Sequence, residues 1–201
     1  LFQALDLAFV KQVLERSYGL KRRGRHPRSL LGQFKTEILK RAARIEGYDE
    51  LHRLMEKDRD LSLLCDVKDG EKPYHPSTLS RFRKRIGPEA LEEIMMHAVK
   101  ELDQVGMLDK RTVALDAAFI KAYSRRDPND TRRGSSDIEA RLRKQGGNVT
   151  LGYGVHLAVD TVSEMPLAVI VEPANTNEKK AAPNLLEKTI KRRSKRRVRH
   201  V

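Results

Sequence analysis

One acidic residue, Asp116, lies in the middle of an apolar stretch and is the first candidate for chemistry in this sequence. An ionised carboxylate inside an apolar strand is costly unless a partner compensates its charge. Hard divalent cations bind carboxylate oxygens, and a metal ion is the natural partner here. A turn cap or an ion pair with a distant arginine would also explain this residue. The alternation around it predicts a β-strand with Val113, Leu115 and Phe119 on one face and Ala114, Asp116, Ala118 and Ile120 on the other.

The charge of the chain restricts its partners. Lys and Arg number 41 against 28 Asp and Glu in 201 residues, a formal net charge of +13. This excess favours a polyanion, most simply a nucleic acid whose phosphates it neutralises, although charge does not distinguish DNA from RNA. The single cysteine, Cys65, excludes an internal disulfide and is typical of a reducing cytoplasm. No apolar run approaches the roughly 20 residues that span a membrane. We therefore expect a cytoplasmic, nucleoid-associated protein.

Residues 1–108 have helical periodicity and are predicted to form an all-α DNA-binding domain. The most informative segment is 74–87, where Ser77 is a good N-cap and Gly87 ends the helix. Leu79, Phe82 and Ile86 form its apolar stripe. A short basic helix of this kind resembles the reading element of a helix-turn-helix, although a solvated basic face is the alternative. The candidate DNA contacts are Ser77, Thr78, Ser80, Arg81, Arg83, Lys84 and Arg85.

Residues 109–201 change to an α/β pattern. After the strand that carries Asp116, a polar insertion covers 125–149, with a short helix expected around 136–144. Strict alternation from Leu151 to Asp160 and a second strand over 166–171 predict a β-hairpin. A helix carrying Ala181, Leu185, Leu186 and Ile190 follows, and the last residues before Val201 are expected to begin a fourth strand. The fold class is therefore mixed: an all-α domain followed by the first part of an α/β domain.

The second half also contains sequence motifs that are similar to those of a known protein family. The segments 115–124, 152–160, 165–167 and 173–178 closely resemble insertion-sequence transposases of bacteria and archaea that have a DDE catalytic domain. The helical half, with the segment 74–85, resembles the domain that precedes it in many such enzymes. The resemblance implies a ribonuclease H-like fold and cut-and-paste transposition by phosphodiester cleavage and strand transfer. It also implies two magnesium or manganese ions, DNA partners (element terminal repeats and target DNA), and a homo-oligomer on DNA.

Three acidic residues hold the metals in that family, and the resemblance assigns the first of them to Asp116. The second lies at the end of the fourth strand and the third on a later helix. We therefore expect both of these acids to be absent from the 201-residue chain, which would be inactive or nearly so by itself. Asp160 ends a hairpin strand beside a turn, where an aspartate is common for local reasons. It is not a candidate ligand.

Further DNA contacts are predicted around the catalytic strand at Lys121, Tyr123, Arg125, Arg126 and His156. A hydrogen-bonded structural role is the alternative for His156, and cover of a sheet edge is the alternative for Tyr123. Two other functions remain open at this point. One is a non-catalytic transposase remnant or repressor that occupies element ends, and the other is a basic RNA-binding protein.

Overall fold

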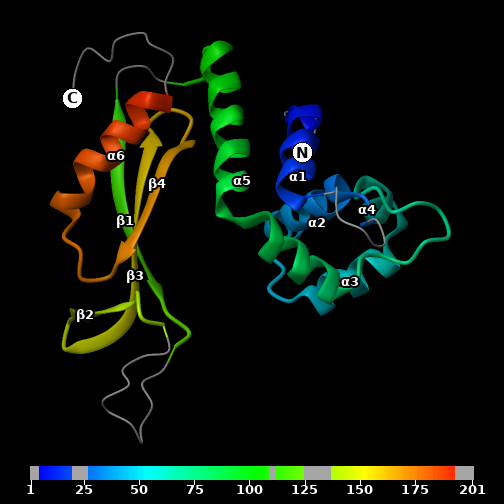
Figure 1. Cartoon of the computed structure of the whole chain (residues 1–201), viewed down its shortest axis with the longest axis horizontal. Helices are drawn as coiled ribbons and strands as arrows, with labels where there is room; N and C mark the ends of the chain where they lie inside the picture. Colours follow the sequence, from blue (N-terminus) through cyan, green and yellow to red (C-terminus); the bar gives the residue numbers. More distant parts are fainter. Residues whose placement is uncertain (1–4, 20–26, 109–111, 125–136, 193–201) are drawn as a thin grey trace, which may run out of the picture. The chain divides into compact units, whose positions relative to one another are not determined.

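The computed structural model describes residues 5–19, 27–108, 112–124 and 137–192, without the side chains of Gln145, Glu178 and Arg192 (Figure 1). The chain divides into two compact units, Leu1–Ala98 and Val99–Val201. This boundary lies inside a helix, about ten residues before the predicted one at 108. Helical periodicity continues through that point, and the sequence pattern therefore gives no sign of the division.

The first unit is helical. Its elements are α1 (Leu7–Tyr18), α2 (Leu30–Ala42), α3 (Tyr48–Lys57), α4 (Arg59–Leu64) and the first part of α5 (Pro76–Gln104). Local capping fixes several of their ends, because Asp6 accepts from the backbone of Ala8 and Phe9, and the Ser29 hydroxyl accepts from Gly32 N. In α5, Gly87 has φ 76° and ψ 172°, and the helix changes direction there, as the Gly-Pro pair predicts.

Two hydrophobic clusters hold the first unit together. One joins α1 and α2 to α5 through buried residues that include Leu14, Phe34 and Phe82. The other packs α3 and the connection between α4 and α5 against α2, with Leu51, Cys65 and Tyr74 at its centre. The predicted stripe of Leu79, Phe82 and Ile86 is buried. The basic residues of this helix are consequently turned outward.

The second unit is an antiparallel sheet with a helix on one face. Its elements are β1 (Val113–Lys121), β2 (Arg141–Gln145), β3 (Asn148–Asp160), β4 (Pro166–Pro173) and α6 (Glu178–Arg192). The long strand β3 is central. One edge of β3 pairs with β1 over Gly152–Asp160. The other edge pairs first with β2, over Asn148–Gly152, and then with β4, over Tyr153–Val159. Helices followed by this sheet and α6 confirm the predicted mixed fold.

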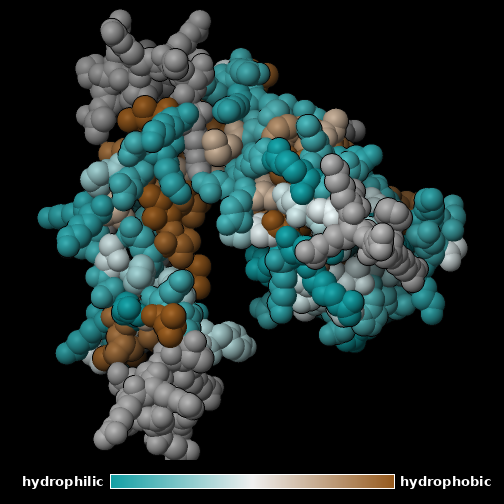
Figure 2. Space-filling view, in the orientation of Figure 1, coloured by the Kyte–Doolittle hydropathy of each residue, from teal (hydrophilic) through white to brown (hydrophobic). Residues whose placement is uncertain are grey.

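Helix α6 covers one face of the sheet, and the other face is more exposed. Directly opposed residues of neighbouring strands share a face, and successive residues alternate. Leu115, Ala117 and Phe119 therefore share the face of His156 and Ala158, where Leu185 of α6 packs on Ala158. The other face carries Asp116. Figure 2 shows hydrophobic residues along the strands of this unit, and side chains of the Asp116 face such as Ile120 and Val171 are more than half exposed.

One predicted element is wrong. The segment expected to form a short helix around 136–144 instead leads into β2, which forms a tight hairpin with the beginning of β3. Gly146 and Gly147 form its turn with φ of 55° and 85°. Two successive positive φ values define the type I′ turn that matches the twist of paired strands, and glycine adopts them without strain. The Gly-Gly pair was the sequence signal for this hairpin.

Replacement of Gly152 by alanine should destabilise the second unit by about 2–3 kcal/mol. An added Cβ would overlap the carbonyl oxygen of Ile120 and lie 2.6 Å from Cζ of Phe119. Both belong to β1, so the strand that carries Asp116 would have to move. Gly154→Ala is the matched control, since its Cβ would meet nothing nearer than His156 Nε2 at 3.4 Å. Equal urea-unfolding midpoints for the two variants would contradict this packing.

Candidate active site

Asp116 lies near the middle of β1, opposite Leu157 of β3. Its side chain is exposed, and Oδ1 accepts a hydrogen bond of 2.8 Å from the backbone of Ala117. The predicted burial of the Asp116 charge is therefore wrong: the carboxylate keeps its contact with water, because α6 covers the other face. The two alternative roles also lack support, since Asp116 caps no turn and pairs with no arginine among the described residues.

The position of Asp116 at the edge of the sheet has a chemical consequence. Within the described residues β1 pairs only with β3, which leaves one edge of β1 open. The hydrogen bond from Ala117 N holds one carboxylate oxygen, whereas no donor among the described residues contacts the other. The neighbours on the same face, Ala114 and Ala118, are small and exposed. The site therefore presents an oriented, accessible carboxylate with space around it.

This carboxylate fits a hard divalent cation in its donor chemistry, but it does not form a complete metal site. No group of three candidate metal ligands in the described part of the chain includes Asp116. Magnesium keeps its water shell unless several oxygen ligands converge. By itself Asp116 offers one carboxylate, and a magnesium site would need further ligands.

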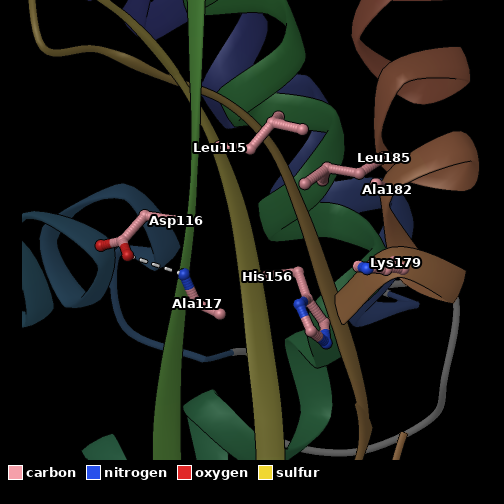
Figure 3. A pocket seen from close by; sticks show the side chains of 7 residues that line it. All are labelled: Leu115, Asp116, Ala117, His156, Lys179, Ala182 and Leu185. Atoms are coloured by element: carbon pink, nitrogen blue, oxygen red, sulfur yellow. Dashed lines mark hydrogen bonds between the residues drawn. The ribbon is translucent and has the colours of Figure 1, made fainter. Parts of the chain in front are cut away.

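His156 lies on the other side of the sheet. It lines a cavity of about 330 Å³ between the sheet and α6, and the other lining residues are Leu115, Asp116, Ala117, Lys179, Ala182 and Leu185. Figure 3 shows that the Asp116 carboxylate points away from His156, whereas the His156 ring points towards α6. His156 is only 5% exposed, and its Nε2 atom has no hydrogen-bond partner in the described part of the chain. The predicted metal ligand Asp116 and the predicted DNA contact His156 therefore point to opposite faces of the sheet.

Two family models match the chain, one in each of its two units. A family model described as "Transposase domain (DUF772)" matches residues 1–85, and one described as "Transposase DDE domain" matches residues 107–200. The chain belongs to the DDE-type transposases of insertion sequences. The comparisons with curated proteins and with solved structures returned no match.

Family membership establishes the general chemistry of this transposase. Its function is DNA transposition, its substrate is DNA, and a DDE domain implies dependence on a divalent metal. These findings favour DNA over the RNA partner that charge alone left open. No helix among the described residues combines the length and hydrophobicity needed to cross a bilayer.

The basic helix of the transposase forms the first part of α5. Two of its arginines contact tyrosine side chains, and two other basic residues make no such contact in the described part of the chain. Arg85 stacks over the ring of Tyr18, with 4.1 Å to the centroid, and Arg83 interacts with the hydroxyl group of Tyr48. Arg81 and Lys84 are exposed and make no hydrogen bond or ion pair within the described residues. Ser77, Thr78 and Ser80 are half-buried on the same helix. Arg81 and Lys84 are thus the most available to a phosphate.

The connection before this helix differs from a standard helix-turn-helix. It extends from Cys65 to His75, longer than the turn of about three or four residues in that motif. Arg28 helps to hold it: its guanidinium donates to Lys72 O at 2.8 Å and pairs with Glu71 at 2.7 Å. The helix-turn-helix assignment therefore remains a prediction.

The other predicted contacts of the transposase lie in different places. Lys121 is exposed at the end of β1 on the α6 face, and Tyr123 beyond it is fully exposed. Arg125 and Arg126 lie outside the described residues. Asp160 is fully buried, and its Oδ2 accepts from the backbone and hydroxyl of Ser163 at 2.8 and 2.7 Å. These bonds give Asp160 the local turn role that the sequence analysis assigned to it.

The sequence analysis missed a polar pair at the base of the β2–β3 hairpin. The Tyr153 hydroxyl donates to Asp137 Oδ1 at 2.6 Å, and the same oxygen accepts from the backbone of Ala140. This hydrogen bond lowers the pKa of Asp137 and raises the pKa of Tyr153 to about 12. Both groups therefore keep their hydrogen-bonding form throughout the neutral range. No spacing in the sequence indicates this pair, because Asp137 precedes β2 in an irregular segment.

Proposed function

We propose that Asp116 is the first metal-binding acid of this transposase, with magnesium or manganese as the ion. The observation that carries this proposal is the exposed carboxylate in the middle of β1, with one oxygen held by Ala117 N and the other accessible. Small residues beside it leave room for an ion and a DNA backbone. The family places its first catalytic acid on the first strand, and Asp116 is the acid that β1 contains.

In this proposal the chain contributes orientation and charge. Ala117 N keeps the Asp116 carboxylate in one orientation, so less freedom is lost when a ligand binds. Divalent ions held in part by Asp116 would supply activation of the attacking oxygen and stabilisation of the leaving oxygen in an in-line phosphoryl displacement. The complete enzyme would then release the element from its flanking DNA and join the freed 3′-hydroxyl groups to target DNA.

We further propose that the basic surface of α5 binds the DNA of the element ends. Arg81 and Lys84 are exposed and unpaired among the described residues, while Arg83 and Arg85 are oriented by Tyr48 and Tyr18. Arginine and lysine side chains on one helix face neutralise phosphates and fix the position of a protein on the duplex. Assembly as a homo-oligomer on DNA belongs to the same proposal.

The test is cleavage of end-labelled DNA by the full-length product of this gene, with and without divalent cation. We expect cleavage with Mg²⁺ or Mn²⁺, and none in EDTA or with Ca²⁺, while DNA binding persists in all of these conditions. Tight DNA binding without cleavage under any metal condition would reject the catalytic proposal. That outcome would support the alternative of a non-catalytic repressor that occupies element ends.

A further inference from the structure

The β2–β3 hairpin is a two-stranded ribbon at the end of the sheet beyond α6 (Figure 1). In the described residues, Asn148–Leu151 of β3 pair only with β2, so that the ribbon is not flanked by another strand there. It is short, tightly turned at Gly146 and Gly147, and exposed at its tip. A ribbon of this kind is free to enter a groove of another molecule.

The two faces of the ribbon have different chemistry. Its register opposes Arg143 to Thr150 and Lys144 to Val149. Because successive residues alternate, one face carries Arg141, Arg143, Asn148 and Thr150. The other face carries Leu142, Lys144, Val149 and Leu151, of which Leu142 and Val149 are about half exposed. Every side chain named on the first face can form hydrogen bonds, whereas the second face is mainly apolar.

The polar face continues onto the sheet. Gly152 is paired with Lys121 on one side and Arg141 on the other, which aligns two cations across a residue without a side chain. Next to this row, Phe119, Arg143, Asn148 and Thr150 line a hollow of about 340 Å³. The side chains of Arg143, Asn148 and Thr150 have no hydrogen-bond partner within the described residues. No Asp or Glu occurs from Arg141 to Val159. Glu172 of β4 shares this face further along the sheet, opposite Gly154, so the cationic part is the ribbon itself, with unused donors.

The base of the ribbon is held rigidly. Asp137 accepts from Tyr153 and from the backbone of Ala140, and its own N–H donates to the Ser124 hydroxyl at 3.1 Å. The Arg141 guanidinium donates to Ile138 O at 2.6 Å and Ala140 O at 3.0 Å. These bonds fix the segment that enters β2. Side chains on a rigid ribbon lose little freedom when they bind a partner.

We infer that the polar face of this hairpin binds a groove of double-stranded DNA, with Arg143 as its central contact. The major groove of B-DNA admits a two-stranded β-ribbon, and Arg, Asn and Thr are residue types that bond to base edges. Double-stranded RNA fits less well, since its major groove is too narrow for side chains to read. The inference rests on the proposed function and adds a second DNA-contacting element to it.

The location of the hairpin separates this contact from the catalytic strand. Thr150 and Leu157, which opposes Asp116, are separated by roughly 23 Å along β3 at about 3.3 Å per residue. The polar face also lies on the α6 side of the sheet, opposite to Asp116. The hairpin therefore holds DNA at a distance from the reacting phosphate and affects binding and sequence preference rather than chemistry.

The test compares Arg143→Gln with Lys144→Gln in the full-length protein. Both substitutions remove one positive charge from the same strand, but on opposite faces of the ribbon. Binding to a short labelled duplex of mixed sequence is measured in EDTA, which prevents cleavage. We expect Arg143→Gln to weaken binding on the order of tenfold and Lys144→Gln less than about threefold. A photo-crosslinking residue should form a DNA adduct at position 143 and not at position 144.

Three results would distinguish a failure of the hairpin proposal from a failure of the proposed function. An equal loss of DNA affinity in the two variants would overturn the hairpin proposal, because it would show only a general electrostatic attraction to DNA. Wild-type affinity of Arg143→Gln without an adduct at position 143 would also overturn it, while the function proposed for Asp116 and α5 would stand. Absence of DNA binding by the wild-type protein would overturn both proposals. Circular dichroism of each variant verifies that the substitution leaves the fold intact.

Discussion

The Asp116→Asn variant of the full-length protein should lose more than about a hundredfold of its metal-dependent DNA cleavage. Even groups that only support a metal ligand cost about 10–100-fold when they are removed, and loss of the ligand itself should cost more. Asparagine keeps the size of the side chain but removes the charge that attracts a divalent cation. Cleavage is followed on labelled duplex DNA with saturating Mg²⁺, and DNA affinity is measured in parallel.

The matched control is Asp103→Asn, which removes an acid from the same unit outside β1. This variant should cleave at the wild-type rate, and both variants should bind DNA with wild-type affinity. Loss of cleavage in Asp103→Asn as well would indicate a general effect of charge. Retained cleavage in Asp116→Asn would exclude a catalytic role for Asp116.

The Gly32→Ala variant should unfold at a temperature at least about 10 °C below the wild type. Gly32 lies on α2 where the connection between α4 and α5 packs, and an added Cβ would overlap both the Tyr74 hydroxyl and the Cys65 carbonyl. These two groups form a buried hydrogen bond of 3.1 Å, and burial raises the pKa of Tyr74 to about 12. The substitution would overpack the core and break this bond, at a cost of about 3 kcal/mol.

Gly47→Ala is the control for this packing, since a Cβ at Gly47 would meet nothing within 4 Å and its φ is −99°. Its melting temperature should stay within about 2 °C of the wild type. The measurement is thermal unfolding followed by circular dichroism. Similar melting curves for the two variants would show that the connection does not pack on Gly32 in solution.

Much of the fold was predictable because its signals are local. The apolar stripe of Phe82 and Ile86 and the Gly87 break define the basic helix by short-range rules. The predicted N-cap is wrong: the helix begins at Pro76, and His75 caps it, because His75 Nδ1 accepts from the backbone of Ser77. The alternation from Leu151 to Asp160 likewise predicts a strand without knowledge of its partners. The family resemblance is confirmed, and it rests on such segments in order.

The features that were missed depend on partners far away in the sequence. The exposure of Asp116 follows from which face of the sheet α6 covers, and no residue near Asp116 indicates that face. The bond between Asp137 and Tyr153 forms only when β3 returns beside the segment that precedes β2. The β2–β3 hairpin is an exception, because its Gly-Gly turn was readable, but the charged residues around it concealed the strand alternation.

The most direct test of Asp116 as a metal ligand is a change of metal preference in Asp116→Cys. A thiolate is a softer ligand than a carboxylate and disfavours Mg²⁺ relative to softer cations. The only native cysteine, Cys65, is buried and should not interfere. Our account predicts that the full-length variant is inactive with Mg²⁺ and regains cleavage with Mn²⁺ or Zn²⁺, whereas the wild type cleaves with Mg²⁺. Wild-type activity with Mg²⁺, or the same loss with every ion, would contradict it.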